Sequence, residues 1–296
     1  MLRGYYMFSR CLFRTFAAVG FSVLAAPAYA TFHLMQIEQV IGGVNGDTTA
    51  QAIQLRMRAP FQNFVAQAQI HAWDAAGANP VLVIDFTQNV ANALAGDRVL
   101  VGSPRFIALT NPNAVPDFMM TNLIPASYLA AGSLTYEDDV GTIFWRLSWG
   151  GSGYTGNTFG DSTNDDDPGF GPANFGPPFP GPLPSATTDA LLFTGPATAL
   201  STTNAADYSL TASAAVFTNN VRNSFTVVAP VVGDIDGDGH VNVSDFTLCA
   251  ACFAGPDVFT RPPACSEHDF TACDLDGDGD VDIEDFADLF LLLTAP

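Results

Sequence analysis

The chain has 296 residues, and its 30 acidic residues against 10 basic ones, all arginine, give a formal net charge of −20. A charge of this sign and size argues against nucleic acid and anionic lipid as partners, because both are themselves negative. The charge is uneven: residues 231–296 hold fifteen acids and one arginine, a net charge of −14, whereas residues 31–230 carry −9. This break predicts two domains that meet near Pro230.

The first thirty residues have the pattern of a secretory signal peptide. Arginines precede an apolar run at residues 16–26, and Ala28-Tyr29-Ala30 is a small-x-small cleavage site. The apolar run is shorter than the roughly 20 residues that a membrane-spanning helix needs. The sequence therefore predicts that residues 1–30 are removed, that the mature protein is secreted to the extracellular space or cell surface, and that it has no membrane span.

Residues 31–230 show strand patterns and no long helical period. In residues 51–58, apolar Ile53, Leu55 and Met57 alternate with polar side chains, which is the period of a half-buried strand. Further strands are expected at residues 34–41, 70–73, 81–86, 98–101, 142–149, 190–193 and 215–225. Short strands separated by Gly, Pro and Asn predict an all-β sandwich.

Three tryptophans in the expected strands bear on function. Trp145 and Trp149 share a face with Leu147, so both indoles are expected in the core, while Trp73 is the better candidate for an exposed ring. His71 is expected to be a surface or edge side chain. The acidic run that begins at Glu137 is expected in a solvated turn before the strand at 142–149.

Residues 150–184 interrupt the strand pattern. They contain nine glycines and seven prolines, a composition that buries too little apolar surface to offset the entropy cost of ordering. We expect a long irregular loop here. Its acidic run, Asp165 to Asp167, lacks the further ligands that a calcium loop requires.

The sequence contains no recognisable catalytic constellation. Gly150-Gly-Ser152-Gly153-Tyr154 lacks the last glycine of a nucleophile elbow. The four histidines are scattered, with no pair at the helical spacing of a metal site. We therefore expect a protein that is not an enzyme.

Several segments of residues 32–228 resemble bacterial lamin-tail-like domains. The resemblance rests on Arg58-Ala-Pro-Phe-Gln-Asn-Phe-Val65, the turn Trp73-Asp-Ala-Ala-Gly77, Asn204-Ala-Ala-Asp-Tyr208 and Asn220-Val-Arg-Asn-Ser224. The first strand has Ile37-Glu38-Gln39 where such domains usually carry Asn-Glu. The resemblance implies an immunoglobulin-like β-sandwich used for adhesion or anchoring, with no catalytic residues.

One acidic motif occurs twice, forty residues apart, at residues 234–245 and 274–285. Each copy places aspartates at loop positions 1, 3, 5 and 12 and a glycine at position 6, the pattern of an EF-hand calcium loop. The candidate metal ligands are Asp234, Asp236, Asp238, His240, Asn242 and Asp245 in the first loop and Asp274, Asp276, Asp278, Asp280, Asp282 and Asp285 in the second. His240 and Asp280 would contribute their backbone carbonyls. The sequence predicts two structural calcium ions.

An apolar helical pattern follows each loop. The residues at i, i+3, i+4 and i+7 are Phe246, Cys249, Ala250 and Phe253 in the first copy and Phe286, Leu289, Phe290 and Leu293 in the second. We expect this stripe to face the core, and Val241 to pair with Val281 across the two loops. Each repeat is therefore expected to be a loop with one exiting helix and no helix leading into it.

The four cysteines of the mature chain, Cys249, Cys252, Cys265 and Cys273, all lie in residues 231–296. In an exported chain they predict two disulfides, with three possible pairings. A redox or zinc role for the Cys249-x-x-Cys252 pair is the weaker interpretation, because Cys265 and Cys273 lack matching spacing.

The two loop-helix repeats resemble a dockerin type I module over residues 233–293. The resemblance implies calcium-dependent docking onto an extracellular or cell-surface protein, for which a cohesin-like receptor is one form. Loop positions 10 and 11, often Ser-Thr in cellulosomal dockerins, are Val243-Ser244 and Ile283-Glu284 here. The expected fold is mainly β: an immunoglobulin-like sandwich at residues 31–230, then a small α-helical dockerin or EF-hand-like module at residues 231–296.

These observations predict a secreted, non-catalytic calcium-binding protein whose β-sandwich is anchored to a partner protein through the dockerin-like module. The alternative is a carbohydrate-active or carbohydrate-binding protein that the dockerin tethers to a polysaccharide-degrading assembly. An exposed aromatic row, or two facing carboxylates in one cleft of the β-sandwich, would favour this alternative.

Overall fold

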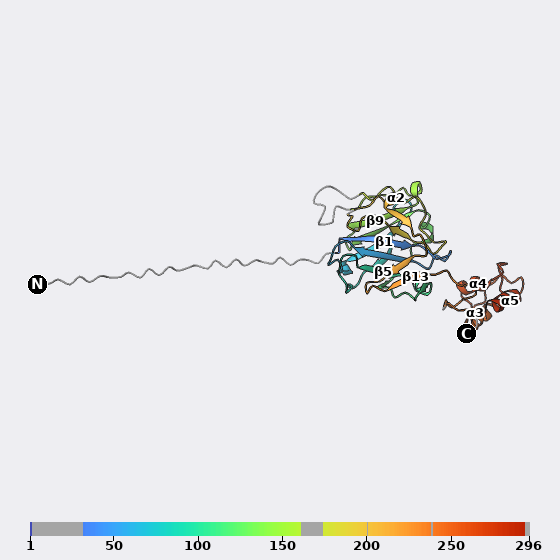
Figure 1. Cartoon of the computed structure of the whole chain (residues 1–296). Coiled ribbons are helices and arrows are strands. Elements are labelled where there is room, and N and C mark those ends of the chain that lie inside the picture. The colour runs from blue at the N-terminus through green and yellow to red at the C-terminus, as the bar shows by residue number, and fades with distance from the viewer. Residues whose placement is uncertain (2–31, 161–173, 200, 238, 294–296) are drawn as a thin grey trace.

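The computed structural model of the chain (Figure 1) describes Met1 and residues 32–160, 174–199, 201–237 and 239–293. The predicted signal peptide and the acidic run Asp165 to Asp167 lie outside the described residues, apart from Met1. Strands make up most of the regular structure of the larger, N-terminal part, and helices that of the C-terminal part. The prediction of a mainly β fold followed by a small helical module is confirmed.

The largest sheet has six strands in the order β11-β10-β1-β2-β5-β7. Its neighbours are antiparallel except β5 and β7, which are parallel. A bulge between Ile37 and Gln39 shifts the register of β1 against β2. The strands are β1 (Met35–Ile41), β2 (Ala52–Met57), β5 (Arg98–Gly102), β7 (Phe118–Met119), β10 (Leu191–Phe193) and β11 (Tyr208–Leu210).

A second, four-stranded sheet has the order β4-β3-β8-β9 and is antiparallel throughout. Its strands are β3 (Ala68–Trp73), β4 (Val81–Asp85), β8 (Gly132–Asp138) and β9 (Ile143–Trp149). Apolar side chains from both sheets form one buried cluster, with Ile37 and Leu55 on one side and Leu134 and Trp145 on the other. This cluster is the core of a β-sandwich.

Hydrogen bonds fix the two sheets against each other inside the core. The indole nitrogen of Trp145 donates to the hydroxyl of Tyr208 at 2.9 Å, and this hydroxyl donates to the carbonyl of Ile37. Both Trp145 and Trp149 are fully buried. The prediction that these two indoles pack in the core is confirmed, whereas Trp73 is half-buried.

A smaller layer covers part of the other face of the six-stranded sheet. It consists of α1 (Pro104–Ala108) and a three-stranded sheet of β6 (Thr110–Asn111), β12 (Val216–Thr218) and β13 (Ser224–Val227). Phe106 and Phe217 pack edge to face, with their ring centroids 5.1 Å apart, and cover Ala52 and Leu100. Short helical turns complete this part of the chain: η1 (Val65–Gln67), η2 (Ala126–Tyr128), η3 (Gly151–Gly153) and α2 (Asn204–Asp207).

The described parts of residues 150–184 form an irregular loop, as expected, but they bury more apolar surface than their composition predicts. Phe175 is fully buried and packs against Trp145 with ring centroids 5.3 Å apart, and Leu183 is buried as well. The amide of Phe179 donates to the carbonyl of Ser148 at 2.9 Å, which extends the four-stranded sheet beyond β9. Composition alone missed these anchors because one buried ring can hold a segment rich in Gly and Pro.

The expectation for the acidic run at Glu137 is confirmed for Asp139, which lies in an exposed turn, and wrong for Glu137 and Asp138, which lie in β8. Glu137 lies in β8, in the interior of the four-stranded sheet, and is only 4% exposed. Its carboxylate contacts Nδ1 of His71 at 2.5 Å, so His71 is a paired side chain and not an ordinary surface one. Burial raises the pKa of Glu137, and the nearby His71 and Arg146 act in the opposite direction.

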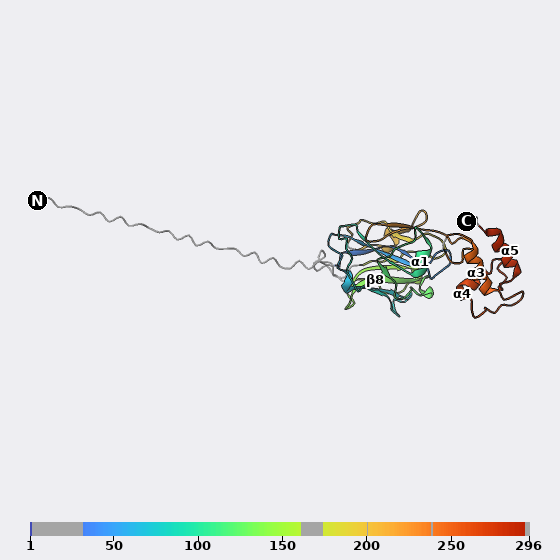
Figure 2. The same ribbon diagram turned by 90° about the horizontal axis from the view of Figure 1, so that it is seen from below.

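The C-terminal part contains α3 (Val243–Cys252), α4 (Glu267–Cys273) and α5 (Ile283–Leu292), which lie together beside the strand layers (Figure 2). Its small buried cluster includes Ile235, Val241, Val281 and Leu289 together with the four cysteines. These cysteines form the disulfides Cys249–Cys273 and Cys252–Cys265. In the described residues, no helix has the length and apolarity to cross a bilayer.

Candidate metal centre

The first aspartate loop is closed by the side chain at its twelfth position. One oxygen of the Asp245 carboxylate accepts hydrogen bonds from the amides of Ile235 at 2.6 Å and Asp236 at 3.1 Å. At the first position, Asp234 accepts from the amides of Gly237 and Gly239. Both ends of the loop are thereby drawn inward, and their carboxylates converge.

The second loop repeats this arrangement. Asp285 accepts from the amides of Leu275 at 2.6 Å and Asp276 at 3.3 Å, as Asp245 does in the first loop. Asp274 accepts from the amide of Gly279 at 3.1 Å. Gly239 and Gly279 have φ angles of +89° and +96°, which L side chains rarely adopt. The glycine at position 6 is therefore required by the backbone of both loops.

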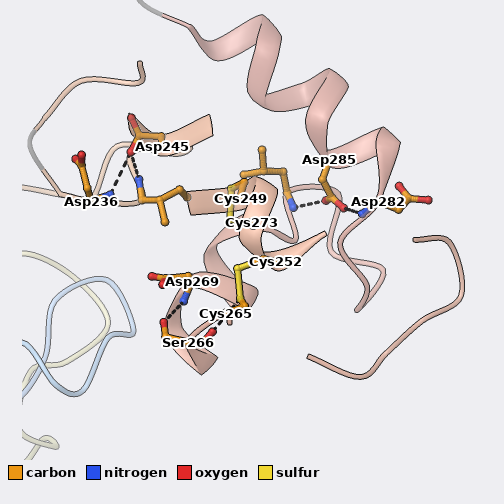
Figure 3. Close-up of a disulfide and its surroundings, with 12 residues drawn as sticks. Asp236, Asp245, Cys249, Cys252, Cys265, Ser266, Asp269, Cys273, Asp282 and Asp285 are labelled. Atoms are coloured by element: carbon orange, nitrogen blue, oxygen red, sulfur yellow. Dashed lines mark hydrogen bonds between the residues drawn. A yellow bond between two sulfur atoms is a disulfide. The ribbon is translucent and has the colours of Figure 1, made fainter. Parts of the chain in front are cut away.

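The helix that leaves each loop begins with a capping box. Figure 3 shows one bond of the second box, between Asp282 and Asp285. In α5 the Asp282 side chain accepts from the amide of Glu284 at 2.7 Å, and Asp285 accepts from the amide of Asp282 at 2.8 Å. Asn242 and Asp245 make the same reciprocal bonds at the start of α3. The residues that would hold an ion thus also start the helices.

The structure gathers nine of the predicted ligand residues into three groups whose carboxylate oxygens lie within 4.8 Å of one another. The groups are Asp234, Asp236 and Asp245; Asp274, Asp276 and Asp278; and Asp280, Asp282 and Asp285. Asp238 lies outside the described residues, His240 is exposed, and Asn242 caps α3. Clustered carboxylate oxygens are the ligands that calcium prefers.

Two buried oxygens indicate that the second loop fits a cation. Oδ1 of Asp274 and Oδ1 of Asp280 are buried and accept no hydrogen bond. Burial raises the pKa of Asp280, and the carboxylates of Asp278, Asp282 and Asp285 raise it further, against a hydrogen bond from the Asp257 amide. A bound divalent ion would supply the missing partner for these oxygens and offset the repulsion.

The Asp280 side chain has a function that the sequence did not predict. The backbone carbonyl was the expected ligand at this position, but the side chain is buried and accepts from the amide of Asp257 at 2.5 Å. The neighbouring amides of Ala254 and Gly255 both donate to the carbonyl of Val281. The end of the first repeat is thereby attached to the second loop.

Two expectations about the helices are corrected. A helix, α4, does lead into the second loop, because it ends at Cys273 immediately before Asp274. The predicted core stripe is only partly buried: Cys249 and Leu289 face the core, whereas Ala250 and Phe290 are exposed. Phe246 and Phe253 pack edge to face on Phe286, at 4.9 and 5.4 Å between ring centroids, and join α3 to α5.

The disulfides exclude the redox interpretation of the Cys249-x-x-Cys252 pair, because the two cysteines are bonded to different partners. Cys249 is joined to Cys273 at the end of α4, and Cys252 to Cys265 just before α4. Both bonds therefore hold α4 against α3. The expectation of two disulfides agrees with the structure, which selects one of the three possible pairings.

Comparison with known proteins assigns the C-terminal part only. No curated protein and no solved structure matches the chain. Dockerin type I domains bind calcium and dock onto cohesin, a protein partner. Residues 232–290, which contain both aspartate loops, α3 and most of α5, match the family model of the dockerin type I domain, and the chain therefore carries a dockerin type I-like module at its C-terminal end.

Proposed function

We propose that this protein is a secreted, non-catalytic anchoring protein whose β-sandwich is attached to an extracellular or envelope partner through the dockerin type I-like module. The observation that carries the proposal is the match of residues 232–290 to the dockerin family, together with the two closed aspartate loops in that stretch. The strong negative charge of the chain argues further for a protein partner and against nucleic acid.

Two calcium ions would act as structural braces. Each loop joins its ligands to the first turn of a helix, so an ion bound in the loop would hold loop and helix together. The cluster of apolar side chains in the module is small, and the module has fifteen acidic side chains, which repel one another, and only one arginine to offset them. The residues of the second loop would bind the ion and position α5, while those of the first would position α3.

Binding to immobilised type I cohesin domains tests the proposal. The full mature chain should bind at least one member of a cohesin panel in calcium and lose binding in chelator, with recovery when calcium is restored. A shortened chain that ends at Pro230, and so lacks the module, should not bind. Binding that persists after confirmed removal of calcium, or a panel without any binding member, would contradict the proposal.

The β-sandwich would supply the adhesive or anchoring function. Its resemblance to lamin-tail-like domains supports this proposal, as does a core that buries Trp145 and Trp149 and so removes them from any sugar-binding row. The carbohydrate-binding alternative has one place where it can be examined. This place is the outer face of β3, where the half-buried rings of Trp73 and His71 have centroids 6.0 Å apart and lie above Glu137.

Affinity electrophoresis on soluble polysaccharides examines this alternative. If the wild-type chain were retarded and Trp73→Ala abolished the retardation, the carbohydrate-binding function would replace the adhesive one. We expect no retardation for either chain. Trp73 donates to the hydroxyl of Thr135 at 2.8 Å, which accounts for its position by packing within the sheet.

A further inference from the structure

The segment between α3 and α4, residues 253–264, is closed into a ring by the Cys252–Cys265 disulfide. Most of it lies on the surface, and Val258 and Phe259 are 41% and 65% exposed. A segment that buries so little apolar surface gains little from packing, so its position depends on the disulfide and on its hydrogen bonds. We call residues 253–264 the clamp.

The hydrogen bonds of the clamp lead to the second aspartate loop. The amides of Ala254 and Gly255 donate to the carbonyl of Val281 at 2.9 and 3.2 Å. The amide of Asp257 donates to the Asp280 carboxylate at 2.5 Å. Three backbone donors of the clamp are therefore directed at positions 7 and 8 of this loop.

These contacts hold the Asp280 side chain inside the module. Asp280 is 2% exposed, its Oδ2 accepts from the clamp, and its Oδ1 is buried without a hydrogen-bond partner. Carboxylate oxygens of Asp280, Asp282 and Asp285 lie within 4.8 Å of one another, and all three side chains are buried. A buried carboxylate oxygen that lacks a donor and lies among other carboxylates suits a cation. The clamp thus fixes one carboxylate more than the loop pattern requires.

The first loop offers a comparison within the same chain. Its position 7 is His240, which is exposed, and its position 9 is Asn242 where the second loop has Asp282. The second loop therefore holds six aspartates and the first loop four. Residues 214–217, forty positions before 254–257, belong to the β-sandwich, where two of them lie in β12. The clamp thus lies outside the repeat that the two loops share.

We infer that the clamp makes the second loop the tighter of two calcium sites, because it holds the Asp280 carboxylate in place as an additional ligand. This inference rests on the proposed binding of calcium in both loops. Calcium affinity in such loops is set by the number of charged ligands and by the rigidity of the site. The second loop has two more aspartates than the first. One of its ligands is also ordered before the ion arrives, so binding loses less conformational entropy.

The disulfide gives the clamp a fixed position. Cys252 is the last residue of α3, and Cys265 lies just before α4. Because the two cysteines are bonded, both ends of the clamp meet at the end of α3. If the ring were opened, the three amide donors would remain but the clamp could move away from the second loop. The second loop should then lose calcium affinity while the first keeps its own.

A calcium titration of the full mature chain, followed by proton–nitrogen NMR, tests the inference because it reads each loop separately. The amides of Gly239 and Gly279 donate to the first aspartate of their own loops, so each signal reports the calcium in its loop. The dissociation constant from Gly279 should be at least about tenfold lower than that from Gly239. A first loop as tight as the second would overturn the inference and leave calcium binding intact. Signals that do not respond to calcium would overturn both.

Two variants of the clamp locate the cause of the difference. Cys252→Ala with Cys265→Ala opens the ring, and Gly255→Ala strains its turn, where φ is +97°, while every cysteine and aspartate stays in place. Each should weaken calcium binding in the second loop at least about tenfold and in the first loop less than about twofold. Gly141→Ala is the matched control. It imposes the same strain, at a φ of +89°, in the turn between β8 and β9, and should weaken neither loop.

Asp280→Asn tests the additional ligand itself. Asparagine can still accept the hydrogen bond from the Asp257 amide, so the clamp stays in place while the charge is lost. The second loop should bind calcium at least about tenfold more weakly, whereas His240→Asn, at the same position of the first loop, should change either loop less than about twofold. Equal weakening of both loops by the clamp variants would mean that the clamp acts through the stability of the whole module. That result, or an unchanged second loop, would overturn the inference.

Discussion

The aspartates at the twelfth loop position, Asp245 and Asp285, each have three hydrogen-bond partners before any ion is considered. Each accepts hydrogen bonds from two amides at the start of its loop and from the amide that precedes its helix. These residues could be predicted from the sequence because the ligand positions follow one another within twelve residues. The contact between Asp280 and Asp257 could not, because it depends on where a distant turn is folded.

Asp245→Ala and Asp285→Ala should each remove one calcium ion from the module. Each change deletes a proposed ligand and half of a capping box, so each should also destabilise its helix by about 1 kcal/mol. Isothermal titration should give two ions for the wild-type chain and one for each variant. A wild-type chain that binds one ion, or a variant that retains both, would contradict the pairing of one ion with each loop.

His71→Ala should destabilise the β-sandwich more at pH 7 than at pH 4. Removing the imidazole leaves the buried Glu137 carboxylate without its nearest side-chain partner, at a cost of about 1–3 kcal/mol. Because burial raises the pKa of Glu137 above its ordinary 4.5, the folded state favours the neutral acid. Stability from this group is therefore complete below pH 4.5 and lost as pH rises through the raised pKa.

Urea unfolding of the wild type and the His71 variant at both pH values measures this difference. Without His71, the pKa of Glu137 should rise further, and the loss of stability between pH 4 and pH 7 should be larger than in the wild type. The double variant His71→Ala with Glu137→Gln should lose the extra dependence of stability on pH. A His71 variant with the same penalty at both pH values would show that the pair is not electrostatically coupled.

At the scale of elements, alternation of apolar and polar residues located most of the strands to within a few positions. β1, β2, β3, β4, β5, β9 and β10 all overlap the ranges expected from the sequence. β8 was missed because its outer face carries Ser133, Thr135 and Glu137, which are buried in this sheet but have the composition of a turn. The short α4 was missed because seven residues are too few to show a helical period.

Phe175→Ala should test the anchoring of the Gly/Pro-rich segment. Phe175 is fully buried against Trp145, and the truncation should leave a cavity that costs about 3–5 kcal/mol of unfolding free energy. Phe159, also in this segment, is 46% exposed, so Phe159→Ala is the matched control and should cost under about 1 kcal/mol. Similar small losses for both variants, measured by thermal unfolding, would mean that the segment contributes little to the core.

Calcium removal should loosen α5 before α3 while the disulfides are intact. One disulfide joins α3 to the end of α4 and the other joins α3 to the segment just before α4, whereas no cysteine lies in α5. Cross-links that close loops of this size contribute about 3 kcal/mol each by restricting the unfolded chain. Hydrogen exchange in chelator should therefore show faster exchange for amides of α5 than for those of α3. Reduction of the two disulfides in chelator should accelerate exchange in α3 as well. Equal exchange rates in α3 and α5 before reduction would contradict the separate bracing of the two helices.

At the scale of the whole molecule, charge and bracing are distributed differently over the two parts. Residues 31–230 have six arginines for fifteen acids, and several of these arginines are paired, as in the contact between Arg98 and Glu38 at 2.6 Å. Residues 231–296 have one arginine for fifteen acids, most of which lie in the two loops, and their net charge is therefore −14. The charge break was visible in the sequence. The separate apolar cluster of the helical part required the structure.

The stability of the helical module should depend on salt when calcium is absent. Repulsion among the carboxylates of the two loops weakens as ionic strength rises, since the screening length falls from about 10 Å at 0.1 M to about 3 Å at 1 M. In chelator, the unfolding temperature of residues 231–296 should therefore rise with sodium chloride concentration, and calcium should remove most of this dependence by neutralising the loops directly.

Calorimetry of the full chain measures this effect, and the unfolding transition of the β-sandwich in the same chain is the control. The β-sandwich is a larger folding unit with paired arginines, and its transition should move much less. If chelation left the salt dependence of the module equal to that of the β-sandwich, loop repulsion would not be the force that calcium opposes.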